Sequence, residues 1–292
     1  MSVSICIFAH NEERLLANCF NAAVNAAHGL DHEIHILENG STDGTANVAD
    51  TLASANPYTT VHHISMADKA GAWNDYVFRL APTADTHVFC DGDIMASEGS
   101  IAALHGALQK NRTAYGAAAL PASGRSQREW AKLLLTKNYL SGNLYALSNR
   151  ALETFRDKEI YFPVGAKGED GLISYILLTD FAGGTNDIHR ENIVVVDDAT
   201  FEFESLALNA RDLWLFDRRL KRYSERHIQK QILYSILKRD GIEAMPKMIS
   251  EIYTRDNLEQ QRPRKHPLYY FYDQNTLARL QENPALAVSN AA

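Results

Sequence analysis

The first half of the chain alternates between short apolar runs and longer stretches in which apolar residues recur every three or four positions. The apolar runs predict strands because β-branched and aromatic residues dominate them, and they lie at residues 2–8, 33–38, 61–65 and 87–90. The periodic stretches predict helices, at about residues 13–28, 46–55 and 68–80. Strands that alternate with helices indicate an α/β fold with a mostly parallel sheet and helices on both faces.

Beyond residue 98 the pattern is less regular. It predicts helices at about 100–109, 129–135 and 172–178, and strands at about 115–120, 141–147, 193–196 and 200–203. From residue 209 onward the pattern is mainly helical. We therefore expect an α/β domain over residues 1–205, with halves at 1–98 and 99–205, and a mainly helical C-terminal extension over 206–292.

Polar loops follow each of the first four predicted strands. They begin at Ala9, Glu38, Asp68 and Asp91. In a parallel sheet these loops share one edge, beyond the carboxyl ends of the strands, which is where ligands bind in open α/β sheets. The loops therefore predict a binding site along this edge.

The segment Asp91-Gly92-Asp93 directly follows a strand that appears buried from its composition. Two carboxylates beside a residue without a side chain leave room for a divalent cation and for phosphates. The same residues are also common in an Asp-Gly hairpin turn, so the motif alone leaves both interpretations open.

A second acidic pair, Glu169 and Asp170, follows the glycine-containing loop 162–168 and begins a predicted helix. Carboxylates in a first helical turn are stabilised by the helix dipole. The pair could therefore serve as a helix cap as well as a catalytic site, and the two roles do not exclude each other.

Composition narrows the class of protein. With 292 residues, 46% hydrophobic and 22% charged, the chain has the makeup of an ordinary globular protein. A net charge of −7 disfavours a general nucleic-acid binder. Cys6, Cys19 and Cys90 lack metal-ligand spacing, and we expect buried free thiols in a reducing cytoplasm. No segment reaches the roughly 20 apolar residues of a membrane span, so we do not expect an integral membrane protein.

Taken together, the loops of residues 2–223 resemble the inverting glycosyltransferases of family 2, which have the GT-A fold. Five segments carry the resemblance, in the expected order: Ala9-His10-Asn11-Glu12, residues 38–45, Lys69-Ala70-Gly71-Ala72-Trp73-Asn74, Asp91-Gly92-Asp93 and Glu169-Asp170. The resemblance implies a GT-A catalytic domain whose nucleotide-binding half is residues 1–98 and whose acceptor half is residues 99–205.

The resemblance also implies the residues of the donor site. Asp93 would bind Mg²⁺ or Mn²⁺ directly, and Asp91 would contact the ribose or reach the metal through water. Lys69 would contact a phosphate or the base, although it could instead be a solvated surface lysine. The remaining expected donor contacts are Ala9, Asn11, Glu12, Glu38, Asp68, Asn74 and Gly92.

Two residues, Glu38 and His189, leave alternatives open. Glu38 stands where the family usually has an aspartate that accepts a hydrogen bond from the nucleotide base, so the sequence does not decide which base the donor carries. His189 could complete the metal shell, as a histidine does in some relatives, or it could be a surface histidine.

On the acceptor side, the resemblance makes Asp170 the general base and Glu169 an acceptor-binding or loop-holding residue. The expected reaction moves one sugar, of hexosyl type, from a nucleoside-diphosphate sugar, with UDP favoured, to a hydroxyl of a glycan or lipid-linked glycan, as in bacterial cell-surface polysaccharide synthesis. Residues 219–223 match the Gln-x-x-Arg-Trp element of processive members poorly. We therefore expect one transfer per encounter.

Residues 211–239 form a predicted helix with nine basic and three acidic side chains among apolar ones. Such a helix could lie peripherally on an anionic membrane at the inner face, or pack on the catalytic domain with a solvated basic face. Two other functions fit the sequence less well than a glycosyltransferase does. A nucleotidyltransferase should have a glycine-rich loop after the first strand, which Ala9-His10-Asn11-Glu12 is not. A non-catalytic nucleotide-sugar binder would leave the two acidic pairs unexplained.

Overall fold

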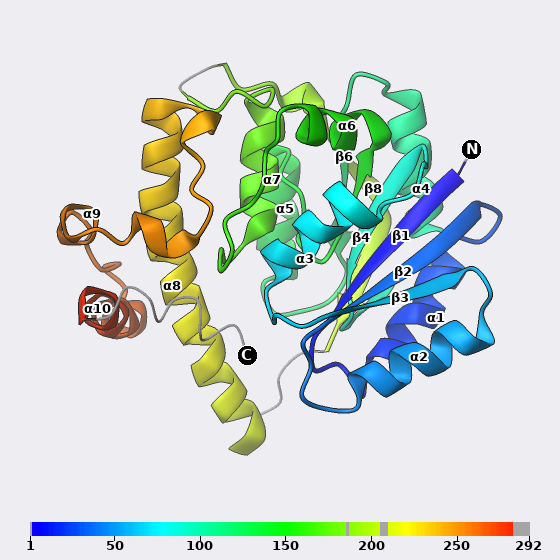
Figure 1. Ribbon diagram of the computed structural model, residues 1–292, viewed down its shortest axis with the longest axis horizontal. Coiled ribbons are helices and arrows are strands. Elements are labelled where there is room, and N and C mark those ends of the chain that lie inside the picture. Colours follow the sequence, from blue (N-terminus) through cyan, green and yellow to red (C-terminus); the bar gives the residue numbers. More distant parts are fainter. Residues whose placement is uncertain (1, 185–186, 205–209, 283–292) are drawn as a thin grey trace.

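The computed structural model describes residues 2–184, 187–204 and 210–282. An eight-stranded mixed sheet lies at its centre, with strand order β3-β2-β1-β4-β7-β6-β8-β5 (Figure 1). The strands are β1 (Ser2–Ala9), β2 (Asp31–Asn39), β3 (Thr59–Ile64), β4 (Thr86–Asp91), β5 (Ile94–Ala96), β6 (Gly116–Pro121), β7 (Leu144–Ser148) and β8 (Ile193–Phe203). The first four strands are parallel, β6 pairs parallel with β8, and β7 and β5 are antiparallel to their neighbours.

Helices connect the strands and extend the chain at its C-terminal end. They are α1 (Leu16–Ala26), α2 (Thr45–Ala55), α3 (Lys69–Asp75), α4 (Ser100–Lys110), α5 (Gln127–Lys137), α6 (Asn149–Asp157), α7 (Glu169–Leu178), α8 (Ala210–Asp240), α9 (Arg255–Glu259) and α10 (Pro267–Glu282). A π-helical turn, η1 (Tyr76–Leu80), continues α3, and short 3₁₀ turns are η2 (Arg190–Asn192), η3 (Ile242–Ala244) and η4 (Ile249–Ile252).

Two apolar cores lie on opposite faces of the sheet, and β1 contributes to both. Its residues Ile5 and Ile7 pack with α1 and α4, whereas Cys6 and Phe8 pack with α3 and α7. Successive side chains of a strand point to opposite faces, so a strand with apolar residues on both faces must be covered on both sides. The expected α/β fold with helices on both faces is therefore confirmed.

Several elements differ from the sequence-based prediction. The single strand β8 replaces the two strands expected at 193–196 and 200–203, and its register with β6 shifts near Ala118 and Leu120. The short strand β5 and helix α6 were not predicted. A three-residue edge strand carries too few positions for a periodic signal, and polar residues dominate the exposed face of α6. All three cysteines are buried and free, as expected.

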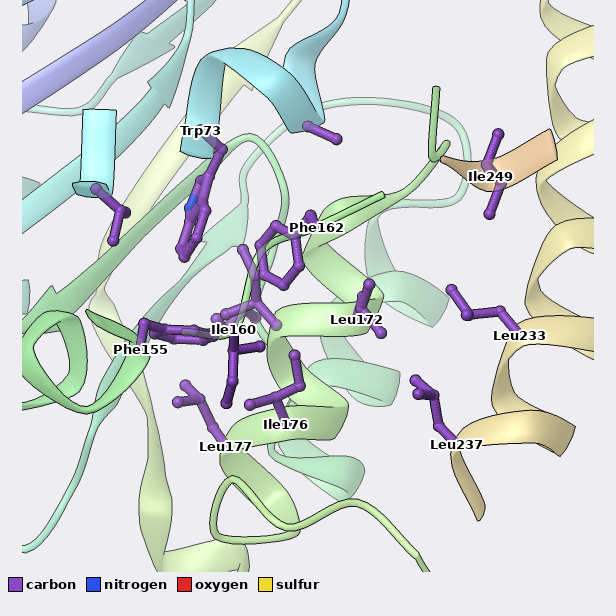
Figure 2. Close-up of a cluster of buried hydrophobic side chains, with 14 of the residues drawn as sticks. Trp73, Phe155, Ile160, Phe162, Leu172, Ile176, Leu177, Leu233, Leu237 and Ile249 are labelled. Atoms are coloured by element: carbon purple, nitrogen blue, oxygen red, sulfur yellow. The ribbon is translucent and has the colours of Figure 1, made fainter. Parts of the chain in front are cut away.

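The C-terminal extension packs on the α/β domain rather than standing apart from it. Figure 2 shows Leu172 and Ile176 of α7 between the aromatic side chain of Phe162 and the leucines Leu233 and Leu237 of α8. All five side chains are at most 4% exposed and belong to one continuous core. The C-terminal half of α8 is therefore part of the domain core, and the boundary expected at 205/206 lies outside the described residues.

Within the described segments, no helix combines the length and apolar character that crossing a bilayer requires.

Candidate functional site

The register of the parallel strands brings three predicted site residues to one edge of the sheet. Ala9 at the end of β1 pairs with Glu38 of β2, and Phe8 pairs with Asp91 at the end of β4. The Gly92 amide donates to the Phe8 carbonyl at 2.8 Å. A Cβ on Gly92 would lie 2.8 Å from that same carbonyl oxygen. Only glycine lets the acidic loop lie this close to β1.

The loops after β1 and β2 are tied together around Asn11, which adopts a left-handed backbone conformation with φ 57°. Its side-chain carbonyl accepts a hydrogen bond from the Thr42 backbone amide at 2.8 Å. The backbone amide of Asn11 donates to Ser41 Oγ at 3.1 Å. Asparagine tolerates this backbone region better than most residues. Asn11 thus fixes the shape of the loop pair where a nucleoside is expected.

Glu38 is buried behind these loops and has partners on both carboxylate oxygens. Oε1 accepts the Ser41 amide at 2.6 Å, and Oε2 lies 3.2 Å from His63 Nδ1. Burial alone would raise the pKa of Glu38, but the hydrogen bonds from Ser41 and His63 outweigh it and lower the pKa below its ordinary value. The His63 ring also lies 3.0 Å from Asp50 Oδ1, so Glu38 belongs to a chain of three polar side chains.

Two further predicted donor contacts hold the backbone in place. Asp68 caps α3 by accepting the Gly71 amide at 2.9 Å, and burial raises its pKa. The Asn74 side-chain amide both donates to the Phe162 carbonyl and accepts the Phe162 amide, each at 2.9 Å. This double hydrogen bond fixes the start of the loop that leads to Glu169.

Lys69 lies at the centre of the site. Its ammonium forms an ion pair with Asp91 Oδ1, lies 2.8 Å from Glu169 Oε1, and donates to the Gly142 carbonyl at 3.2 Å. Although burial opposes ionisation of Glu169, the Lys69 charge lowers the pKa of that carboxyl below its ordinary value. One cation therefore joins the acidic pair after β4 to the acidic pair at the start of α7.

The carboxylates around Asp93 repel one another. Burial, with the charges of Asp93 and Asp91, raises the pKa of Glu12 to about 8. Burial raises the pKa of Asp91 to about 6 despite the nearby Lys69, and Asp93 adds to the rise. Unfavourable negative charge of this kind fits a divalent cation with oxygen ligands.

The protein alone does not build a complete metal shell. Over the described residues, no three His, Cys, Asp or Glu side chains converge on one point. Mg²⁺ in phosphate-transfer sites is commonly held by one or two carboxylates, with substrate phosphates and water completing the shell. The residues present therefore fit a metal that Asp93 and Asp91 hold together with a bound diphosphate.

Asp170 lies beside Glu169 in the first turn of α7. Its Oδ1 is 2.8 Å from Arg226 Nη2 of α8, and the Asp170 side chain is 20% exposed. A Cβ on Gly142 would lie 2.9 Å from the carboxyl carbon of Asp170, so Gly142 makes room for this side chain. The remaining exposure leaves the carboxylate accessible to a ligand.

Helix α8 holds the loop before the acidic pair, and the sequence pattern did not reveal this role. Gln229 accepts the Lys167 amide at 2.7 Å, and Glu225 lies 3.0 Å from the Lys167 ammonium. Val164 and Met248 form an isolated parallel bridge on the same side. These contacts join residues more than 50 positions apart in the chain, so no local sequence pattern indicates them. The basic amphipathic pattern of α8 indicates only that the helix has a buried and a solvated face.

His189 is not brought to the acidic residues. Its amide donates to the carbonyl of Leu178, the last residue of α7, whereas Glu169 is the first. A ten-residue helix is about 15 Å long, and His189 is held at the opposite end of α7 from the acidic pair. The exposed His189 ring lies instead 3.1 Å from Glu191 Oε1.

The family model described as "Glycosyl transferase family 2" matches residues 4–165, which include β1, the Lys69 helix and the Asp91-Gly92-Asp93 loop. The chain belongs to glycosyl transferase family 2. It is therefore an enzyme that transfers a sugar from a nucleotide sugar to an acceptor, in the glycosyltransferase class EC 2.4. Family membership favours this activity over the nucleotidyltransferase and the non-catalytic binder.

Solved structures agree on the fold. The mannosyltransferase PcManGT from Pyrobaculum calidifontis, in complex with GDP-Man and Mn²⁺, superposes with a TM-score of 0.59 at 16% identity, over 98% of this chain and 77% of that one. The S. aureus TarS fragment 1–349 gives a TM-score of 0.54 at 13% identity, over 86% of this chain and 69% of that one. The expected GT-A fold is thus confirmed. A search of curated protein sequences finds no match.

Proposed function

We propose that this family 2 enzyme is an inverting, metal-dependent hexosyltransferase that moves one sugar from a UDP-sugar to a hydroxyl of a glycan or lipid-linked glycan, as in bacterial cell-surface polysaccharide synthesis. The proposal rests mainly on Lys69, because its ammonium forms ion pairs with both Asp91 and Glu169. A donor held near Asp91 and an acceptor held near Glu169 would meet at this point, as an in-line transfer requires.

On the donor side, Asp93 and Asp91 would hold Mg²⁺ or Mn²⁺ together with the diphosphate, and a bound cation would supply positive charge beside the leaving diphosphate. Lys69 contributes a second positive charge beside the phosphates. Ala9, Asn11 and Gly92 shape the nucleoside site, whereas Asp68 and Asn74 act through the backbone they hold. Glu12 lies near Asp93 and, with its pKa raised to about 8 by burial and by the charges of Asp93 and Asp91, is largely protonated at neutral pH.

On the acceptor side, Asp170 removes the proton from the acceptor hydroxyl. The hydroxyl oxygen forms a bond to the anomeric carbon while the bond from that carbon to the diphosphate oxygen breaks, and the diphosphate departs with the electron pair. A single displacement of this kind inverts the anomeric centre. Arg226 compensates the charge of the Asp170 carboxylate, and Glu169 holds Lys69 and the loop beside it.

Glu38 is the residue proposed to contact the donor base. Its carboxylate is ionised and held by Ser41 and His63, so it can accept a further hydrogen bond from the N–H of a uracil. A guanine also offers N–H donors, and PcManGT is described with GDP-Man. UDP is our choice because the family resemblance favours it, and the screen below includes both bases.

The proposed location is the cytoplasm, with peripheral contact to the inner face of the membrane. Exposed Trp214, Phe216 and Tyr223 accompany the basic side chains of α8, a combination that suits an anionic lipid surface. The net charge of −7 argues against nucleic acid as a partner. The proposed division keeps residues 1–98 as the nucleotide half, 99–205 as the acceptor half and 206–292 as the extension.

A donor screen tests the proposal. The purified chain is incubated with UDP- and GDP-hexoses, with Mn²⁺, with Mg²⁺ or with chelator, and release of nucleoside diphosphate is measured. We expect metal-dependent release from one UDP-hexose. If the amount of nucleoside diphosphate released were the same with chelator as with metal, the proposed metal dependence would be wrong. If release occurred only from a GDP-sugar, the proposed choice of uracil as the base would be wrong.

A further inference from the structure

A small pocket lies beside the acidic pair, between the loop before α7 and the helix α8. Its walls are the first turn of α7, the loop residues that precede it, and one face of α8. The residues are Ala166, Lys167, Gly168, Glu169, Gly171, Leu172, Arg226, Gln229, Lys230, Leu233 and Tyr234. We call it the α8 pocket. None of its α8 side chains has a role in donor binding in the proposal above.

The α8 pocket has more positive than negative charge available to a ligand. Arg226 and Lys230 are four residues apart on one face of α8, an arrangement of like charges that destabilises a helix unless an anion lies nearby. Arg226 pairs with Asp170. Lys230 makes no ion pair within the described part of the chain, and its ammonium instead lies 5.2 Å from the centre of the Tyr234 ring.

The acidic side chains at the pocket already form ion pairs. Glu169 is held by Lys69, and Lys167 on the other wall has its own partner in Glu225. Burial, followed by repulsion from Arg226, lowers the pKa of Lys230, although the charge of Asp170 opposes this shift. Lys230 is exposed and lines the pocket, so its ammonium is accessible to a ligand there.

The wall opposite Lys230 also favours an anion. Helix α7 begins at Glu169, and its N-cap residue Gly168 has no side chain to cap it. The Gly171 amide in this first turn donates only weakly, to the Gly168 carbonyl at 3.2 Å. A Cβ on Gly168 would lie 2.1 Å from Arg226 Nε, so only a glycine lets this turn approach the guanidinium. Backbone amides and two cationic side chains thus line the same small space.

We propose that the α8 pocket binds an anionic group, a phosphate or a carboxylate, carried by the acceptor. The inference rests on the proposed function, because it places this group beside Asp170, the proposed base. Arg226 contacts Asp170 and lines the pocket, so the attacking hydroxyl and the anionic group lie within a few bonds of each other on the acceptor. The preferred acceptor is therefore a phosphorylated or acidic sugar or polyol rather than a neutral glycan.

The test uses inorganic phosphate and glycerol 3-phosphate as probes and needs no turnover. Binding to the full chain is measured by calorimetry with the donor site saturated by UDP and Mg²⁺, for the unmodified chain, Lys230→Gln and Lys238→Gln. Lys238 is a matched control, since it is an exposed lysine in the last turn of the same helix. We expect Lys230→Gln to weaken binding about tenfold, the value of one charge-assisted hydrogen bond, and Lys238→Gln to leave it unchanged.

A parallel arm replaces the soluble probes by vesicles that contain phosphatidic acid, because the same phosphate could belong to a lipid. Binding of either probe that depends on Lys230 supports the proposed anion site, and the probe that binds shows whether the phosphate belongs to a soluble acceptor or to a lipid. Binding that UDP and Mg²⁺ abolish, or that Lys230→Gln leaves unchanged, would overturn the proposed anion site. Melting temperatures of both variants confirm folding. A failure of donor cleavage in the screen above would contradict the proposed function without affecting this binding result.

Discussion

Arg226 of α8 lies 2.8 Å from Asp170 of α7, so a helix beyond the matched family region supplies the counter-ion of the acid that we propose as the base. The two residues are 56 positions apart in the chain. Gln229, one turn further along α8, holds the backbone of the same loop. The C-terminal extension is therefore part of the site, and its removal would disturb the acidic pair.

The first prediction concerns Asp170. Asp170→Asn keeps the size of the side chain but removes its basicity, so transfer should fall by roughly 10²-fold or more while donor binding persists. Steady-state kinetics and calorimetry with the donor measure the two quantities. The product formed from an α-linked donor should be β-linked, which an NMR coupling constant reports. Near-normal transfer by the variant, or a retained configuration, would remove Asp170 from this role.

The second prediction concerns the metal. Asp93→Ala removes a carboxylate that compensates the charge of a cation beside the diphosphate, so binding of a nucleoside diphosphate should weaken at least about tenfold and lose its dependence on Mg²⁺ or Mn²⁺. Calorimetry with and without chelator measures this. Asp198→Ala, at an exposed aspartate of β8, is the control and should bind as the unmodified chain does. Equal binding by the unmodified chain in chelator would contradict the metal role.

The third prediction concerns the ion pairs of Lys69. Lys69→Met leaves Asp91 and Glu169 without their shared cation, which should cost about 3 kcal/mol of unfolding free energy. Urea denaturation measures it. The double variant Lys69→Met/Glu169→Gln should recover part of the loss, because one of the unpaired acids is then neutral. Lys110→Met, at an exposed lysine of α4, should change stability little. If the Lys69 variant were equally stable, the ion pairs would not contribute to folding.

The fourth prediction concerns pH. The hydrogen bond that His63 donates to Glu38, and then the neighbouring Asp50, raise the pKa of His63. Its charged form is therefore favoured in the folded chain, and this contribution to stability is fully present below about pH 6.5 and is lost as the pH rises through the folded-state pKa. His63→Gln should lower the melting temperature more at pH 6 than at pH 9. His28→Gln, at an exposed histidine, is the control, and a difference independent of pH would contradict the pairing.

The fifth prediction concerns the outer part of α8. Changing Arg219 and Arg222 to glutamate should abolish salt-sensitive binding to vesicles that contain anionic lipid, because each basic residue near such a surface contributes about 1 kcal/mol. The melting temperature should not fall, since these side chains lie outside the buried part of the helix. Vesicle sedimentation at low and high salt measures the effect. If the unmodified chain does not sediment with vesicles at low salt, α8 has only its packing role.

The sequence by itself determined the sheet edge of this site. Strand formers followed by polar loops predict parallel strands, whose carboxyl ends lie at one edge of the sheet, and this places the loops at Ala9, Glu38 and Asp91 together. The pairing of Ala9 with Glu38 and of Phe8 with Asp91 is seen only in the structure. The acidic motif Asp91-Gly92-Asp93 can also be recognised in the sequence, because its three residues are adjacent in the chain. The family resemblance drawn from these loops is confirmed by the family model.

Only the tertiary structure decided how these residues are coupled. That Lys69 joins Asp91 to Glu169, that Arg226 meets Asp170, and that His189 lies at the opposite end of α7 all depend on how distant elements pack. Charge patterns in a sequence indicate which face of a helix is buried, but not which acid a given cation will meet. The partner is set by the packing of α8 against α7, where side chains far apart in the chain are brought within hydrogen-bond distance.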